Sequence, residues 1–232
     1  MGGAITQLFP PSPTFTEKNI PSLVGKVYIV TGGNAGVGLE VVKILYSKGA
    51  TVYVAGRSAA KIATEIESIK STYPESNGQL KSLLVDLSDL TTISTCTSTF
   101  LAQESRLDVL FNNAGVSRRR PGSASVQGHE LHIATNCLGP FLLTKHLISI
   151  LQRTAKLSPP GSVRVVFTSS GIIDMNGPPG GLSLAELVPG NFSKDVNRNY
   201  SASKAGDWFL ASEFDKRTRK DRILCVHSRQ GR

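Results

Sequence analysis

A tyrosine and a lysine stand four residues apart in the segment Tyr200-Ser201-Ala202-Ser203-Lys204. On a helix this spacing places both side chains on one face. A free tyrosine has a pKa of about 10, but a neighbouring ammonium group favours the phenolate. Tyr200 could therefore act as a general acid or base at neutral pH. By itself the same spacing also fits an exposed helix face, so the assignment depends on the motifs around it.

A glycine-rich segment, Thr31-Gly32-Gly33-Asn34-Ala35-Gly36-Val37-Gly38, follows a short β-branched run and opens a predicted helix. Glycine permits a tight turn and lets free backbone N–H groups approach a pyrophosphate at the positive end of the helix dipole. The alternative is a tight turn without a ligand. We assign a dinucleotide site to four residues of this segment, Gly32, Gly36, Val37 and Gly38.

The residues after the next two strands bear on the choice of nucleotide. Arg57 stands where an NAD-binding fold places an acidic residue for the ribose 2′-hydroxyl. A guanidinium at this point can pair with a 2′-phosphate, which predicts NADP rather than NAD, although a surface arginine that begins a helix is the alternative. Asp86 could accept a hydrogen bond from the adenine amino group or cap the next helix.

Further motifs follow in a fixed order along the chain. Asn112-Asn113-Ala114-Gly115 comes after the fourth predicted strand, Ser169-Ser170 after the fifth, and then Tyr200 and Lys204. Together with the glycine-rich turn, this ordered set resembles the short-chain dehydrogenase/reductase family over about residues 25 to 226. The resemblance implies an NAD(P)-dependent oxidoreductase that moves a hydride between a nicotinamide and a carbonyl or alcohol.

The resemblance also implies roles for individual residues. Tyr200 is similar to the family's proton donor, and Lys204 to the residue that lowers the tyrosine pKa and holds the nicotinamide ribose. Ser170 matches the serine that binds the reacting oxygen, with Ser169 as the alternative. Asn136 resembles the asparagine of a water-linked proton relay to Lys204, and Asn113 the asparagine whose turn supports the adenosine side of the cofactor.

Within the family, the chain is most similar to reductases of the retinol-dehydrogenase and protochlorophyllide-reductase type. This resemblance depends on Asn136-Cys137-Leu138-Gly139-Pro140-Phe141 and on the long stretch between Ser170 and Tyr200. The family's Pro-Gly turn and final strand are absent from the sequence before Arg232. We therefore expect a C-terminally truncated fold, and a catalytically weak or inactive dinucleotide-binding protein remains the alternative to an enzyme.

Alternating strands and helices must position these residues. We predict strands in six short β-branched runs that are apolar on both faces, as is typical of a parallel sheet. Val37, Val41 and Leu45 predict a helix that stops at Gly49, and Ile62, Ile66 and Ile69 predict another after the N-cap Ser58. The pattern indicates a doubly wound, three-layer αβα Rossmann fold. The six predicted strands are Val27–Thr31, Thr51–Ala55, Leu80–Val85, Val109–Phe111, Val163–Thr168 and Ile223–Val226.

The domain and charge patterns limit the other functions. We expect an extended, proline-containing arm over residues 1–24 and a single NAD(P)-binding Rossmann domain, truncated at its C-terminus, over residues 25–232 of the 232-residue chain. The net charge of +9 is concentrated in residues 216–232, where seven basic residues accompany only Asp221, so a solvated helix face is preferred to nucleic-acid binding. We expect a small-molecule carbonyl or alcohol substrate, and homo-oligomerisation is left open.

The remaining expectations concern cysteines and location. Cys96, Cys137 and Cys225 have neither disulfide nor metal-ligand spacing, so no metal site is expected. No segment is long and apolar enough to predict a membrane span, and a cytoplasmic location is expected. The N-terminal Met1-Gly2-Gly3-Ala4-Ile5-Thr6 fits an N-myristoylation pattern at Gly2, but one acyl chain without a polybasic segment gives no stable membrane association.

Overall fold

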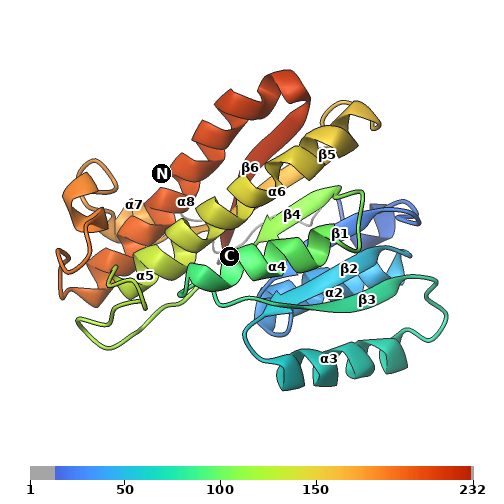
Figure 1. Ribbon diagram of the computed structural model, residues 1–232, viewed down its shortest axis with the longest axis horizontal. Coiled ribbons are helices and arrows are strands. Elements are labelled where there is room, and N and C mark those ends of the chain that lie inside the picture. Colours follow the sequence, from blue (N-terminus) through green and yellow to red (C-terminus); the bar gives the residue numbers. More distant parts are fainter. Residues whose placement is uncertain (1–13, 231–232) are drawn as a thin grey trace.

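Six parallel strands form one sheet in the order β3-β2-β1-β4-β5-β6 (Figure 1). The computed structural model describes residues 14–230, so the acylation pattern at Gly2 lies outside the described residues. The strand order reverses between β1 and β4, which is the point where doubly wound folds bind ligands. The strands are β1 Val27–Thr31, β2 Thr51–Gly56, β3 Gln79–Leu84, β4 Val109–Asn112, β5 Val163–Ser170 and β6 Ile223–Gln230.

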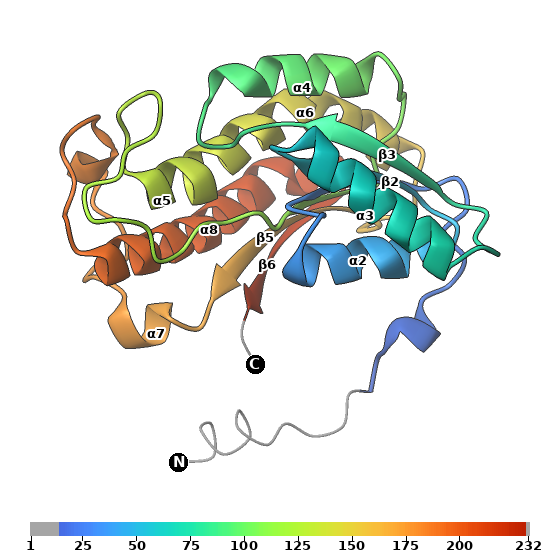
Figure 2. The ribbon, with the colours of Figure 1, turned by 90° about the horizontal axis from the view of Figure 1, so that it is seen from below.

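Helices lie on both faces of the sheet, which gives the predicted three-layer arrangement (Figure 2). One face carries α2 Gly36–Ser47 and α3 Ala59–Thr72. The other carries α4 Thr91–Leu101, α6 Gly139–Lys156 and α8 Val196–Thr218. The shorter elements are η1 Glu17–Asn19, α5 Leu131–Ile133, the π-helical turn η2 Ala134–Leu138, α7 Ile173–Asn176, η3 Leu184–Leu187 and η4 Arg219–Asp221.

The side chains of β1 point alternately to the two faces of the sheet, so this one strand contributes to two hydrophobic cores. Ile29 packs into the cluster that contains the apolar residues of α4, α6 and α8. Its neighbours Tyr28 and Val30 pack into the second cluster with α2 and α3. All five residues of β1 are buried, because successive side chains of a strand point to opposite faces and both faces are covered here. The prediction of a parallel sheet with a doubly wound topology is confirmed.

Two of the strand predictions need correction. β3 was expected to be apolar on both faces, but Leu84 is 52% exposed and most of the strand is only partly buried. The reason is that β3 pairs only with β2 and forms one edge of the described sheet. β6 continues to Gln230, beyond the predicted end at Val226, because it pairs with β5 along the whole length of that strand.

The predicted apolar stripe of α2 is also partly wrong. The residues that pack against the sheet are Val42, Leu45 and Tyr46, whereas Val37 is 53% exposed. Since α2 begins at Gly36, Val37 lies in its first turn and borders the site described below. The second helix prediction is confirmed, because Ile62, Ile66 and Ile69 of α3 are buried and the Ser58 hydroxyl accepts a hydrogen bond from the Lys61 N–H.

The three cysteines are free and buried. Burial raises the pKa of Cys96 to about 12 and that of Cys225 to about 11. Burial also raises the pKa of the Cys137 thiol well above its ordinary value. Residues 14–230 contain neither a helix able to span a membrane nor a group of histidine, cysteine and carboxylate residues able to hold a metal ion.

The amino ends of β1 and β4 are joined through the buried carboxylate of Asp108. It accepts hydrogen bonds from Arg106 Nε at 2.6 Å and from the Val27 backbone N–H at 3.0 Å. The Lys26 ammonium lies 3.2 Å away. Burial favours the neutral carboxyl, but the hydrogen bonds and charges of these partners outweigh it and lower the Asp108 pKa. The charged carboxylate therefore stabilises the end of the sheet opposite the switch point.

Replacing Asp108 with asparagine should lower the free energy of unfolding by about 2 kcal/mol at neutral pH, because the partly exposed Arg106 and Lys26 lose a charged, buried partner. A lowered pKa means that the stabilisation is present above the unfolded pKa of the carboxyl group and is lost as the pH falls through the folded pKa. Urea unfolding should thus show a difference in the free energy of unfolding between the two proteins that narrows as the pH falls below about 4, the ordinary pKa of an aspartate. A difference that stays constant with pH would contradict this role of the Asp108 charge.

Candidate functional site

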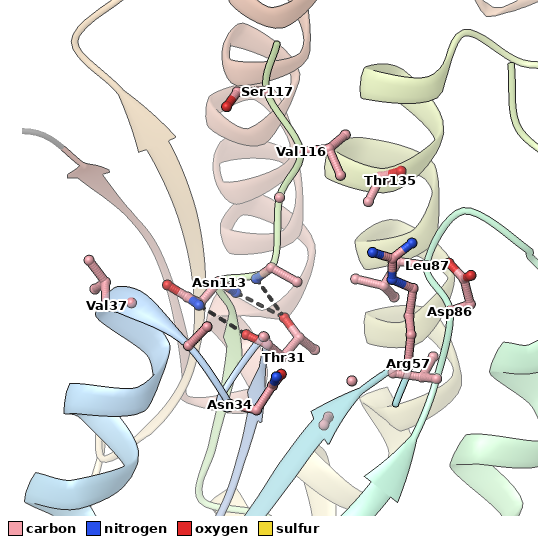
Figure 3. Close-up of a pocket in the computed structure, with 18 of the residues that line it drawn as sticks. Thr31, Asn34, Val37, Arg57, Asp86, Leu87, Asn113, Val116, Ser117 and Thr135 are labelled. Carbon is pink, nitrogen blue, oxygen red and sulfur yellow. Dashed lines mark hydrogen bonds between the residues drawn. The ribbon is translucent and has the colours of Figure 1, made fainter. Parts of the chain in front are cut away.

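A cavity of about 420 Å³ opens at the carboxyl ends of β1, β2 and β4 (Figure 3). It lies at the switch point of the sheet, where the loops after these strands diverge. Its lining contains predicted residues from five separate segments of the chain. The predicted site residues in the lining are Gly32, Gly36, Val37, Arg57, Asp86, Asn113, Tyr200 and Lys204.

The glycine-rich turn has the backbone geometry that makes glycine necessary. Gly32 and Gly36 have φ angles of 66° and 53°, in the left-handed region that side chains disfavour. At Gly38, which does not itself line the cavity, an added Cβ would meet the carbonyl oxygen of Gly32. The N-cap of α2, Ala35, makes no side-chain capping bond, so the first N–H groups of the helix are left for another acceptor. The turn therefore suits an anionic ligand.

The Thr31 hydroxyl connects this turn to the turn after β4. It accepts hydrogen bonds from the backbone N–H groups of Asn113 and Ala114, each at 3.0 Å, and donates to the Phe111 carbonyl at 3.1 Å. The Asn113 side-chain amide donates in return to the Thr31 carbonyl at 3.0 Å (Figure 3). Asn113 thus links the turn after β4 to the end of β1, and it lines the cavity.

Arg57 and Asp86 lie on the side of the cavity formed by β2 and β3. Figure 3 shows the Arg57 side chain beside Asp86 and Leu87. The Asp86 carboxylate accepts hydrogen bonds from the N–H and hydroxyl of Ser88, at 2.9 and 2.6 Å. The alternative that Asp86 caps the next helix is wrong, since it is Asp89 that accepts a bond from the Thr91 N–H at the start of α4. Asp86 therefore remains a candidate for ligand contact.

Tyr200 and Lys204 lie on α8, whose N-cap Asp195 accepts hydrogen bonds from two backbone N–H groups. Both residues line the cavity, as expected from their spacing on one helix face. Lys204 is only 3% exposed. Its Nζ donates to the Thr168 carbonyl at 2.6 Å and to Asp207 Oδ2 at 2.9 Å. An ammonium group has three N–H donors, so one remains for the cavity.

The two adjacent serines at the end of β5 have different environments. Ser169 is buried, and its hydroxyl donates to the Lys204 backbone carbonyl at 2.8 Å. Ser170 is partly exposed and accepts a hydrogen bond of 3.3 Å from the Ile172 N–H, which leaves its own hydroxyl hydrogen for another partner. This difference favours Ser170 over Ser169 as the serine that meets a ligand, although Ser170 lies outside the cavity lining.

Asn136 lies beneath the cavity, in the π-helical turn η2, and is 1% exposed. Its Oδ1 accepts a hydrogen bond from the Val116 N–H at 2.8 Å, and its Nδ2 donates to the Val116 carbonyl and to Ser203 Oγ. A Cβ at Gly115 would lie 3.2 Å from Asn136 Oδ1 and 3.4 Å from Lys204 Nζ. Asn136 therefore joins the loop after β4 to α8 close to Lys204.

Sequence reasoning missed several buried polar residues around the tyrosine. Thr135 lines the cavity, and its hydroxyl has no partner among the described residues. His132 packs edge-on against Tyr200 with ring centroids 6.0 Å apart, and Glu130 holds its Nδ1 at 2.6 Å. Asp207 pairs with Lys204. The only signal for Asp207 in the sequence is its position three residues after Lys204, one helical turn away.

A comparison with protein families matches residues 26–181 to the model of the short chain dehydrogenase family. Among curated proteins, the short-chain dehydrogenase/reductase iacJ of Pestalotiopsis fici is 47% identical over 97% of this chain and 70% of its own length. A short-chain dehydrogenase/reductase of Phomopsis amygdali is 48% identical over 92% of this chain and 64% of its own. The chain thus spans about two thirds of these relatives.

Solved structures show the same similarity. The RhlG/NADP active-site complex of Pseudomonas aeruginosa is 26% identical to this chain and superposes with a TM-score of 0.70. The match covers 91% of this chain and 74% of that structure. The fold and the arrangement of the parallel sheet are therefore shared well beyond the segment that matches the family model.

Replacing Thr31 with valine should destabilise the protein by about 2 kcal/mol, because two partly buried N–H groups lose their acceptor. Valine preserves the shape of the side chain, so the loss reports on the hydroxyl. Thr31→Ser is the matched control, since it keeps the hydroxyl and should cost only about 1 kcal/mol. Chemical unfolding measures both variants, and equal stabilities would show that the hydroxyl does not join the two turns.

Proposed function

Because the chain belongs to the short-chain dehydrogenase/reductase family of oxidoreductases, which act on CH–OH or C=O groups, we propose that it transfers a hydride between NADP and a small carbonyl or alcohol substrate. Tyr200 serves as the general acid or base. One observation carries this proposal: Tyr200 and Lys204 line the same cavity as the glycine-rich turn and Arg57. The cavity thus combines a proton-transfer group with a cradle for a nucleotide.

The cavity has the chemical features that a dinucleotide requires. The turn at Gly32 and Gly36 and the uncapped start of α2 offer backbone N–H groups to a pyrophosphate. The packing of Gly38 against the Gly32 carbonyl leaves no space for a side chain, so the helix lies close to the strand. The third N–H of Lys204 is available for a ribose hydroxyl. These residues would hold the cofactor, which supplies the hydride when it is bound.

Arg57 supports NADP over NAD. It follows the end of β2 at Gly56, where an NAD-binding site needs a carboxylate, and its exposed guanidinium lines the cavity. A guanidinium can bind a phosphate through two parallel hydrogen bonds, whereas it offers little selectivity for a ribose hydroxyl. The likeness to the RhlG/NADP complex of Pseudomonas aeruginosa is consistent with this choice.

The chain's own residues account for the proton transfer. In the reducing direction the Tyr200 hydroxyl gives its proton to the substrate oxygen while the carbonyl carbon accepts the hydride, and an alcohol results. The Lys204 ammonium favours the phenolate that remains. Ser170 donates a hydrogen bond to the substrate oxygen. Asn136 fixes the loop at Val116 and belongs to the route by which a proton reaches Lys204.

The proposal includes finer assignments that follow from the sequence. They are a site of the retinol-dehydrogenase and protochlorophyllide-reductase type, a cytoplasmic location, and a role for Asp86 at the adenine amino group. The alternative of a binding protein with weak or no catalysis is not favoured, because the tyrosine–lysine pair lies in the cavity that would bind the nucleotide.

Tyr200→Phe should reduce NADPH oxidation with a panel of ketones and aldehydes by about 100-fold or more, because the proton donor is removed. NADPH binding, measured by fluorescence titration, should remain. Tyr73→Phe is the matched control, since Tyr73 lies at the end of α3, outside the cavity. A Tyr200→Phe protein as active as the parent would remove Tyr200 from the mechanism.

Arg57→Ala should erase most of the preference for NADPH, weakening NADPH binding by about tenfold while changing NADH binding little. Isothermal titration with both nucleotides measures the preference. Arg153→Ala removes an exposed arginine from α6, away from the cavity, and should leave both affinities unchanged. Equal affinities of the parent protein for the two nucleotides would refute the assignment of NADP.

A further inference from the structure

A buried carboxylate contacts the lysine of the candidate site. Asp207 lies on α8, three residues after Lys204, and is 2% exposed. Its Oδ2 accepts a hydrogen bond from Lys204 Nζ at 2.9 Å, and both side chains of this ion pair are buried. Lys204 also lines the cavity beside Tyr200. The carboxylate is therefore placed behind the ammonium group, on the side away from the cavity lining.

The buried position of Asp207 is unfavourable for a charged carboxylate. Burial raises the pKa of Asp207 to about 7, against the opposite effect of Lys204. Asp207 also acts on the buried thiol of Cys137 in the neighbouring turn η2, and Glu130 acts on the same thiol. Buried ion pairs seldom stabilise a fold more than apolar residues of similar size would. Stability alone therefore does not account for a carboxylate at this place.

We infer that Asp207 is a positioning residue: it holds the Lys204 ammonium at the cavity wall and balances its charge, which limits the effect of Lys204 on the Tyr200 hydroxyl and suits the site to carbonyl reduction. This inference rests on the function proposed above for Tyr200. It adds a direction to that function, since a phenol donates the proton that reduction consumes, whereas alcohol oxidation needs the phenolate as a base.

The ion pair between Lys204 and Asp207 acts on Tyr200 through electrostatics. A lone ammonium in a poorly solvated site strongly favours a nearby phenolate. A carboxylate 2.9 Å from the same ammonium turns the pair into a dipole, whose effect on a third group falls off more steeply with distance. The second hydrogen bond of Lys204, to the Thr168 carbonyl, fixes the position of Nζ but carries no net charge. His132, whose Nδ1 is bonded to Glu130, also faces the Tyr200 ring at a centroid distance of 6.0 Å. Asp207 is the carboxylate that pairs with Lys204 itself, so it is the group that limits the effect of Lys204 on Tyr200.

The first test follows the phenolate absorbance of the free protein near 295 nm as the pH rises. Subtracting the curve of the same protein with Tyr200→Phe isolates the absorbance of Tyr200. Burial raises the pKa values of Tyr28 and Tyr53 to about 12, so these two tyrosines ionise only at high pH. In Asp207→Asn the Tyr200 signal should appear at a pH lower by about one unit, because the Lys204 charge is no longer balanced. An unchanged curve would overturn the inference.

Asp108→Asn is the matched control, because Asp108 is also a buried carboxylate with cationic partners but lies at the opposite end of the sheet. It should destabilise the fold without moving the Tyr200 signal. A shift of similar size in Asp108→Asn would assign the effect to general destabilisation and contradict the inference. The absorbance readout needs no turnover, so it tests Asp207 even if the enzyme activity proposed above is not found.

Kinetics with Asp207→Leu tests the positioning role separately. Leucine removes both the charge and the acceptor of the Lys204 hydrogen bond, whereas asparagine keeps an acceptor oxygen. The KM for NADPH should rise about tenfold in the leucine variant and less than twofold in the asparagine variant, and both variants should gain alcohol oxidation relative to carbonyl reduction. Equal KM values for NADPH in the two variants would contradict the inference. So would an unchanged ratio of kcat for alcohol oxidation to kcat for carbonyl reduction.

Discussion

The hydroxyl group of Thr31 is the contact on which the site depends. It joins the turn after β1 to the turn after β4 at the point where the strand order reverses, through three hydrogen bonds between 3.0 and 3.1 Å. In a parallel sheet, neighbouring loops at a switch point run in opposite directions and leave a gap between them. Thr31 is the last residue of β1, and its fully buried side chain bonds the end of β4 and the turn after it. It therefore sets the spacing between the glycine-rich turn that follows Thr31 and the residues after β4.

A second set of contacts links this region to α8. Asn136 bonds the backbone of Val116 on one side and Ser203 on the other, and Cys137 Sγ bonds the Ser203 carbonyl at 2.9 Å. An added Cβ at Gly206 would meet Cys137 Sγ, so glycine is required for this close approach of η2 and α8. The position of the Tyr200–Lys204 face relative to the nucleotide turn thus depends on a small number of buried polar contacts.

Most of the fold followed from local patterns in the sequence. The β-branched runs located all six strands, since a strand buried on both faces has a strong apolar signal. The exposure of side chains was less predictable. β3 is partly exposed because it lies at the edge of the sheet, and Val37 is exposed because it lies in the first turn of α2. Both positions depend on how the whole sheet is assembled. Among the residues around the site, Thr135, His132 and Asp207 escaped local reasoning, because their closeness to Tyr200 and Lys204 depends on how η2 and α8 pack and on which side chains are buried. The roles of Ser170, Tyr200 and Lys204 come from motif order and stay predictions; Tyr200 and Lys204 line the cavity, and Ser170 lies outside its lining.

The three buried cysteines give the molecule internal reporters of partial unfolding. Thiol reagents attack the thiolate, and all three thiols have raised pKa values and little contact with solvent in the folded state. Cys96 is in α4, Cys137 is in η2 against α8, and Cys225 is in β6, so each sits in a different structural unit. The rate at which each one reacts therefore measures how often that unit opens, with no label added to the chain.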